Sequence, residues 1–400
     1  MTQIVTLRLI NVAMFVLGLV LFRMVLAKTK ASPAVANAAV LFFTLTPVVG
    51  QLAAHINYDN MLMPCIAGSV LLTLHFRERL LDKKQFSSRS LAGIIILCSL
   101  ASLVKYPFLP IFAGIVVYLT YLLWSVSHST KQRLHLLKSF LKDWASVAKW
   151  QKTAIIIGLV VGVGLFSYTY GTNLIVYQNP VPQCGQVLGV ARCQAYGPWA
   201  RNFRAAQHIV NGPNIFYFIP NWIGGMFERL FFVVNGSTGP AFYQNFIAPV
   251  LAATAALGGA IGLFLFARHG RRNLSRDRAL AVILFIMLAY VVALWARNYH
   301  DYVQLGQMVA INGRYLVLVV LPFYLAAAIG WQQWLAGRST NLRLGLLTAA
   351  FLLCLQGGGI ISYIVYSNQY WYWPDSKWVQ TTNKNIQKVV KPFVWAPKIR

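Results

Sequence analysis

Acidic side chains are scarce in this chain, which has 8 Asp and Glu against 35 Lys and Arg in 400 residues. Charged residues of both signs make up only 11% of it, and 58% of the residues are hydrophobic. Soluble globular domains are about a quarter charged and a little under half apolar. The composition therefore excludes an ordinary soluble domain and predicts an all-α, polytopic transmembrane helical bundle.

Several signatures of catalysis are missing as well. The sequence has no Walker A loop, no CxxC zinc pattern, no HExxH motif and no serine nucleophile elbow. The strings "GLVVGVG" (158–164), "LGGAIG" (257–262) and "QGGGI" (356–360) lie inside apolar runs, where close helix packing explains them better than nucleotide binding. These absences disfavour an ATP-driven pump. Three histidines between the apolar runs show no metal-ligand spacing, so no cofactor is expected and a divalent metal is unsupported: His55, His208 and His300.

Long apolar runs are what the sequence has in quantity. Runs of roughly 17 to 25 mostly apolar residues are the length of a transmembrane helix. Ten such spans are expected, within a transmembrane domain covering residues 1–366: 7–26, 33–54, 60–76, 90–104, 107–126, 153–176, 243–267, 279–296, 315–335 and 343–366. The fourth and fifth meet at "KYPF", where Pro107 marks a turn or break.

The connections between these spans alternate in charge. Alternate loops such as "RERLLDKKQFSSR" and "RHGRRNLSRDR" hold most of the basic residues, so the positive-inside rule places them in the cytoplasm. The basic residues behind the net charge of +27 therefore orient the protein in the membrane and contact anionic lipid. Nucleic-acid binding is not expected. The same alternation places the N-terminus and the tail 367–400 outside, and the aromatic cluster 370–374 suits an outer membrane interface.

Two connections have further features. The stretch 131–150 is amphipathic and predicts a cytoplasmic helix lying on the membrane surface. The outer stretch 177–242 is too long for a simple connector, and its aromatic run 214–234 predicts interfacial or re-entrant helices. Cys184 and Cys193 in this outer stretch are either two free thiols or a disulfide, which an oxidising compartment favours.

Candidate chemistry is concentrated on the outer face. Carboxylates and a histidine beside several arginines at the lipid boundary could deprotonate an acceptor hydroxyl and hold a lipid-linked phosphate. The candidate catalytic groups are Asp59, Glu228 and Asp301. Arginines of the same face that could contact a phosphate are Arg201, Arg204 and Arg314.

Each catalytic candidate also has a purely structural interpretation. Asp59 could cap the helix that begins near residue 60. Glu228 could pair with Arg229 at the interface, and Asp301 could belong to a solvated turn with His300. Arg314 is harder to explain in this way, because an arginine entering a long apolar span needs a partner or a phosphate.

Three segments together resemble a known family. "HINYDNML" after the second span, "SLVKYPFLPIF" at 102–112 and "INGRYLVLVVLPFYLAAA" at 311–328 are similar to the signature regions of a bacterial polytopic membrane family of unknown function, number 2142. That family is grouped with the GT-C glycosyltransferases. Asp59, Lys105, Arg314 and Tyr315 carry over as signature positions, and their placement suggests Lys105, Arg314 and Tyr315 as phosphate contacts.

The resemblance implies a bacterial plasma-membrane enzyme that transfers a sugar from a polyprenyl-phosphate donor to an extracytoplasmic glycan, lipid or protein. GT-C enzymes are expected to carry their catalytic carboxylate in a first large outer loop near the N-terminus, which this sequence lacks. We therefore expect one of three alternatives. The first helix and loop are missing from this sequence, a partner supplies them, or another outer carboxylate takes the place of the catalytic one. The alternatives are a transporter or flippase of lipid-linked glycans and a non-catalytic subunit of a cell-envelope assembly complex.

Overall fold

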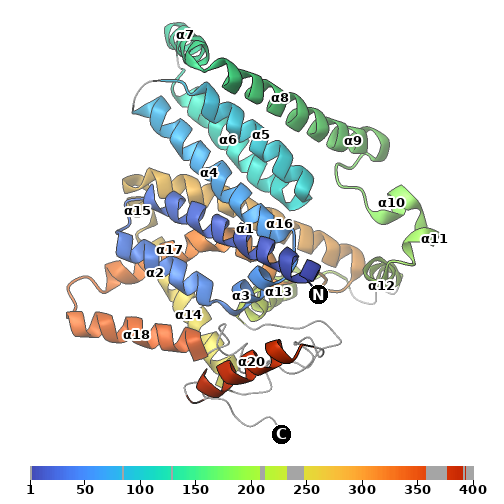
Figure 1. Ribbon diagram of the computed structural model, residues 1–400, viewed down its shortest axis with the longest axis vertical. Coiled ribbons are helices and arrows are strands. Elements are labelled where there is room, and N and C mark those ends of the chain that lie inside the picture. Colours follow the sequence, from blue (N-terminus) through green and yellow to red (C-terminus); the bar gives the residue numbers. More distant parts are fainter. Residues whose placement is uncertain are drawn as a thin grey trace.

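The computed structural model describes residues 2–82, 85–127, 129–207, 212–231, 247–356, 376–390 and 392. Every regular element in these ranges is helical and none is a strand, which confirms the all-α prediction (Figure 1). The first half of the chain forms α1 (Thr2–Ala27), α2 (Pro33–Leu45), α3 (Pro47–Ala54), α4 (Asp59–Leu81), α5 (Ser88–Val104), the 3₁₀ turn η1 (Tyr106–Phe108), α6 (Leu109–Ser125), α7 (Thr130–Ser146) and α8 (Lys149–Phe166).

The second half continues with the π-helical segment η2 and a set of short outer helices before the long helices resume. These elements are η2 (Ser167–Gly171), α9 (Thr172–Tyr177), α10 (Cys184–Leu188), α11 (Val190–Cys193), α12 (Gly197–Ala206), α13 (Ile215–Phe231), α14 (Ile247–Arg268), α15 (Gly270–Arg276), α16 (Arg278–Leu305), the 3₁₀ turn η3 (Gly313–Leu316), α17 (Val317–Trp334), α18 (Thr340–Gln356) and α20 (Lys377–Val390).

Helices suited to crossing a membrane dominate the described ranges. Five are long and apolar enough by length and composition: Gln3–Ala27, Tyr106–Ser125, Lys149–Tyr177, Arg278–Leu305 and Gly313–Trp334. A sixth is counted if the bent pair Pro33–Leu45 and Val48–Ala54 is one span. The ten expected segments are helical where they are described, apart from a break at Thr46 and the terminal residues Val126 and Leu335, and residues 243–246 and 357–366 of them lie outside the described ranges.

The second expected span is not one straight helix. It bends by 73° between α2 and α3. The residue before a proline is pushed out of the helical region towards extended backbone, and Thr46 before Pro47 has φ −65° and ψ 126°. The bend turns α3 across the end of the bundle, where it contacts α1, α13 and η3.

Other boundaries also differ from the sequence predictions. The amphipathic helix expected over 131–150 ends at Ser146, because Val147 is extended, and α8 starts at Lys149. The helix expected to end at 296 continues to Leu305, so "RNYHDY" is helical and not a turn. Of the C-terminal tail, residues 376–390 and 392 are described, whereas the aromatic cluster 370–374 lies outside.

The core lies where the long helices pair. α1 packs against α4, α5 against α4 and α8, α6 against α16, and α17 against α2 and α14 (Figure 1). The side chains of Phe22, Phe43, Phe76 and Phe108 are almost completely buried in it. Association of helices in lipid depends on close van der Waals packing, so these contacts hold the bundle together.

Glycines allow some of these helices to approach closely. A Cβ atom on Gly158 would lie 2.8 Å from Cδ1 of Ile96 in α5, and one on Gly262 would lie 2.8 Å from the Ala327 carbonyl oxygen in α17. This bears out the packing interpretation of the first two glycine strings, whereas 357–360 of the third lie outside the described ranges. Gly330 of α17 is pressed directly onto the Gly262 carbonyl of α14.

Gly330→Ala is expected to lower the free energy of unfolding by about 1–3 kcal/mol, because an added methyl group forces the α14 and α17 backbones apart. Gly345→Ala in α18 is the matched control, since no atom lies within 4 Å of a Cβ built there. Unfolding in detergent micelles measures both variants. Equal stability of the two would contradict the close crossing of α14 and α17.

Candidate functional site

Polar side chains gather at one end of the bundle, where α4 begins, α5 ends and η3 leads into α17. The loop before α4 is shaped by asparagines: Asn57 Oδ1 accepts from the Asp59 backbone N–H at 3.0 Å, and Asn11 Oδ1 in α1 accepts from the Asn57 N–H at 2.9 Å. The buried Asn60 donates to the Leu52 carbonyl oxygen at 2.9 Å. These bonds fix the "HINYDN" loop between α1, α3 and α4.

An ion pair joins this loop to the end of α5. Lys105 Nζ lies 2.6 Å from Asp59 Oδ1, and the two side chains are 14% and 6% exposed. Lys105 reaches this place because it ends α5 in an extended conformation, before η1. Asp59 Oδ2 also accepts from Asn57 Nδ2 at 3.2 Å. The helix begins at Asp59 itself, with Tyr58 as an N-cap that makes no side-chain bond, so Asp59 is the counter-ion of Lys105 and not a cap.

Tyrosine rings surround the ammonium group. Lys105 Nζ is 4.3 Å from the ring centroid of Tyr58 and 5.7 Å from that of Tyr315, both within reach of a cation–π contact. Arg314 stands on the other side of Tyr315: its Nη2 donates to the Tyr315 hydroxyl at 3.1 Å, and its guanidinium carbon is 5.0 Å from the ring centroid. Tyr315 therefore links the two cations.

The charges at this place do not balance. Arg314 is exposed and forms no ion pair within the described part of the chain. Lys105 and Arg314 thus share a single carboxylate, that of Asp59. An exposed guanidinium beside an ammonium group, with one counter-ion between them, is an arrangement that attracts an anion.

The "NGRYL" segment presents Arg314 through several local interactions. Asn312 Oδ1 accepts from the Arg314 backbone N–H at 3.1 Å and caps η3. Gly313 is pressed against the α13 backbone at Met226 and Leu230, where no side chain fits. The Tyr290 hydroxyl of α16 donates to the Tyr315 carbonyl oxygen at 3.0 Å.

Arg229 is a second support of the same segment. Its Nη1 donates to the Ile311 carbonyl oxygen at 2.7 Å, two residues before Gly313. Arg229, Asn60 and Tyr290 were not among the site residues expected from the sequence. Tyr290 does leave a signal, since a tyrosine in an apolar span needs a partner for its hydroxyl.

Asp301 lies next to this cluster but in a different ion pair. Arg297 Nε is 3.2 Å from Asp301 Oδ1, one turn away on α16. Tyr106 of η1 interacts electrostatically with Arg297, Asp301 and Lys105, so it lies between the two ion pairs. Glu228 belongs to α13, one residue before Arg229, and its side chain lies outside what the structure describes.

The other two arginines expected to bind phosphate lie on α12. Arg201 donates to Asn202 Oδ1 of its own helix at 3.1 Å, and Arg204 to the Ala200 carbonyl oxygen at 3.3 Å. Both are exposed, and α12 packs beside α16. These hydrogen bonds stay within α12, so they do not join either arginine to Arg314.

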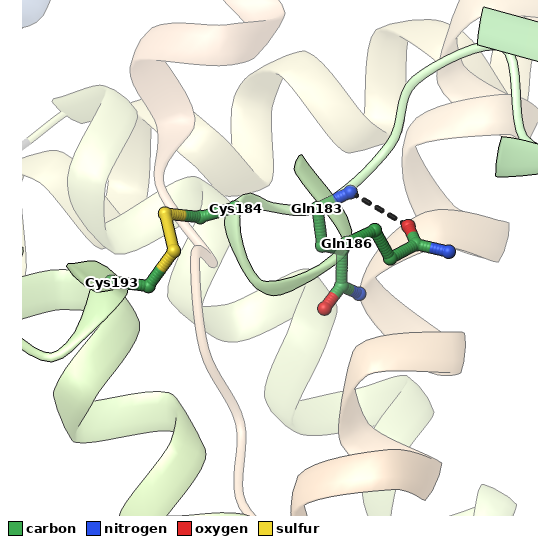
Figure 2. The surroundings of a disulfide bond; sticks show 4 residues. All are labelled: Gln183, Cys184, Gln186 and Cys193. Atoms are coloured by element: carbon green, nitrogen blue, oxygen red, sulfur yellow. Dashed lines mark hydrogen bonds between the residues drawn. A yellow bond between two sulfur atoms is a disulfide. The ribbon is translucent and has the colours of Figure 1, made fainter. Parts of the chain in front are cut away.

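The segment before α12 is closed by a disulfide. Cys184 and Cys193 are bonded, with their Cα atoms 5.9 Å apart. Figure 2 shows this bond at the ends of α10 and α11, and beside it the Gln183 backbone N–H donating to Gln186 Oε1 at 2.9 Å. Trp199 and Phe203 of α12 stack with centroids 4.9 Å apart. The pairing gives this part of the outer stretch a compact form.

In the described ranges no three or more His, Cys, Asp and Glu side chains come together in a group that could hold a metal ion. His208 lies outside these ranges. His55 lies near the cluster, and burial, followed by the charges of Arg8 and Arg314, lowers the pKa of its imidazole below the usual 6.5. The side chain is therefore neutral at pH 7.

The helical fold with its membrane-suited helices defines a polytopic membrane protein, and comparison with known proteins supports the GT-C class of membrane glycosyltransferases. Residues 2–142 match a family described as dolichyl-phosphate-mannose-protein mannosyltransferase. The match spans α1 to most of α7 and includes Asp59 and Lys105. It supports a membrane glycosyltransferase of the mannosyltransferase kind, but it does not confirm family number 2142.

No curated protein and no solved structure matches the chain significantly.

Lys105→Met is expected to lower the free energy of unfolding by about 3 kcal/mol, because it leaves the buried Asp59 carboxylate without its counter-ion. The double variant Lys105→Met with Asp59→Asn is expected to be closer to the wild type, since no unpaired charge remains. Unfolding of both variants and of Asp59→Asn in detergent completes the double-mutant cycle. Additive effects of the two changes would show that the pair does not interact.

His55 gives a pH dependence of stability. Its folded pKa lies below its unfolded pKa, so the unfolded state takes up the proton first as the pH falls through about 6.5. Wild-type stability, relative to His55→Gln, is therefore expected to be constant above that pH and to decrease below it. Thermal unfolding between about pH 5 and pH 8 checks the sign. A relative stability that rises on acidification would contradict the lowered pKa.

Proposed function

We propose that this protein is a GT-C type glycosyltransferase that transfers a sugar from a polyprenyl-phosphate donor to an extracytoplasmic acceptor at a bacterial plasma membrane. The family that matches residues 2–142 is described as using dolichyl-phosphate mannose, so mannose is the first sugar to test. The observation that supports the proposal is that Lys105 and Arg314 both lie near the ring of Tyr315, while Asp59 is the only described carboxylate in an ion pair with either of them.

The donor's phosphate fits the charge of this cluster. A phosphodiester linked to a sugar carries one negative charge, which the exposed Arg314 guanidinium can bind with two parallel N–H bonds. The ammonium group of Lys105 acts as a point charge, so it can be shared between Asp59 and a phosphate oxygen. The tyrosine rings of Tyr58 and Tyr315 keep water from part of the site and strengthen both interactions.

In the proposed reaction, Lys105 and Arg314 act on the leaving phosphate. An acceptor hydroxyl oxygen forms the new bond to the sugar's anomeric carbon, and the bond from that carbon to the phosphate oxygen breaks. Polyprenyl phosphate leaves with the electron pair, and Lys105 and Arg314 stabilise the negative charge that develops on it. A carboxylate takes the acceptor's proton.

Asp59 is our first candidate for that base, because it already lies 2.6 Å from Lys105 Nζ. In the ion pair its Oδ1 is already occupied by the ammonium group. A phosphate that draws Lys105 towards itself weakens this pair and frees the carboxylate to accept a proton. Asp301, which is 17% exposed beside Arg297, and Glu228 are the remaining candidates of the outer face.

Arg314→Gln is expected to lower kcat/KM for mannose transfer by about 10²–10³-fold, the usual effect of removing one group that stabilises developing charge. Arg314→Lys is expected to recover part of the loss, because it restores the charge without the planar fork. The assay measures labelled mannose passing from polyprenyl-phosphate mannose into lipid, glycan and protein fractions of vesicles that contain the protein.

Arg343→Gln, an exposed arginine on α18, is the matched control and is expected to keep wild-type activity. Polyprenyl-phosphate binding that is lost in Arg314→Gln and kept in Arg343→Gln supports the phosphate site. Binding and movement of the donor across the bilayer without mannose transfer would replace the proposal by a transporter or flippase. Donor binding that is unaffected by Arg314→Gln would sink the proposed site.

A further inference from the structure

The amphipathic helix α7 has two distinct faces, and only one of them is used inside the protein. Its inner face holds the connection between α4 and α5: Asp143 Oδ2 accepts from the Ser88 backbone N–H at 2.8 Å and from the Ser88 hydroxyl at 2.6 Å. Ser139 Oγ accepts from the Phe86 N–H at 2.9 Å, and the rings of Phe86 and Phe140 meet edge to face at 5.2 Å.

The outer face of α7 is apolar and uncovered. Leu134, Leu137 and Leu141 are 53%, 55% and 55% exposed. Their spacing of three and four residues places them in one row along the helix. Trp150, at the start of α8, is 72% exposed. A helix that served only to brace α4 and α5 would not need leucines on its free side.

Lysines flank this leucine row. Lys131, Lys138 and Lys142 are exposed, and their spacing of seven and four residues places them together along the side next to the leucines. None of the three forms an ion pair in the described ranges. A row of leucines beside a row of lysines matches a bilayer surface, where the leucines enter the acyl boundary and the lysines meet anionic headgroups.

The position of α7 in the chain confines it to such a surface. The candidate spans Tyr106–Ser125 and Lys149–Tyr177 stand on either side of it, separated from it only by residues 126–129 and 147–148. Both ends of α7 are therefore held where a span leaves the hydrocarbon. In Figure 1 α7 lies beyond the ends of α5, α6 and α8.

We infer that the face formed by Leu134, Leu137, Leu141, Lys131, Lys138 and Lys142 is a binding surface for anionic lipid. The lysines select an anionic over a zwitterionic bilayer, since each lysine near such a surface contributes about a fivefold preference. This inference is independent of the proposed transferase activity. The helix α7 packs at the start of α5, whereas Lys105 follows the other end of α5.

The test uses a fluorophore that reports its surroundings. Leu137→Cys is labelled with nitrobenzoxadiazole in a full-length chain whose Cys65, Cys98 and Cys354 are replaced by alanine. His135→Cys, which lies in line with the lysines and not with the leucines, is the matched control. Both proteins are placed in vesicles of phosphatidylcholine alone and of phosphatidylcholine with phosphatidylglycerol, with and without nitroxide-bearing lipid.

The label at position 137 is expected to shift to the blue and to be quenched by the nitroxide lipid in vesicles with phosphatidylglycerol, while the label at 135, at the level of the headgroups, is expected to shift less and to be quenched less. Changing Lys131, Lys138 and Lys142 together to glutamine is expected to reduce the ratio of bound to free helix on the order of a hundredfold. The same change at three exposed lysines of α20, Lys377, Lys384 and Lys388, is expected to leave it unchanged.

Three results would overturn the inference. A label at 137 that remains in a polar environment in both kinds of vesicle shows that the face does not meet lipid. Equal burial in phosphatidylcholine alone, unaffected by the three lysine changes, shows that anionic lipid is not recognised. A blue-shifted label that nitroxide lipid does not quench shows that protein, not lipid, covers the leucines.

Discussion

A buried carboxylate–ammonium pair joins the start of α4 to the end of α5, and the polar end of the bundle is arranged around it. Removing Asp59 and Lys105 from water costs several kcal/mol for each charge, which their attraction offsets only with good geometry and further hydrogen bonds. The structure supplies both through the short Nζ–Oδ1 distance, the Asn57 amide and the Tyr58 ring. The loop and the α5 terminus are therefore held together at a defined point.

The second cation, Arg314, depends on a different set of contacts that meet the first at Tyr315. α13 holds the segment before it through Arg229 and through the close approach of Gly313, and α16 holds the segment after it through Tyr290. Five separate parts of the chain thus converge on one anion-attracting cluster. The proposed binding of a lipid-linked phosphate uses this convergence, because the cluster has more positive than negative charge.

Much of this could be foreseen from particular residues. The apolar runs predicted helices correctly, since a helix satisfies its backbone groups internally and suits a bilayer. Asp59 and Arg314 stood out because charged residues at the ends of apolar spans are few, whereas Lys105 and Tyr315 were expected only from the resemblance of their segments to a known family. The bend at Thr46 was missed, although the proline that follows it was visible. Arg201 and Arg204 looked equivalent to Arg314 because sequence alone does not show which arginines meet.

The sequence by itself determined the class of protein, the helices and most of the side chains now found at the outer end of the bundle, because these follow from composition and local periodicity. Only the tertiary structure decided that Asp59 is a counter-ion and not a cap, and that Gly313 is required for contact with α13. It also decided that the arginines of α12 stay apart from Lys105. Ion pairs and close backbone approaches join residues far apart in the chain, and helix periodicity carries no information about which distant ends meet.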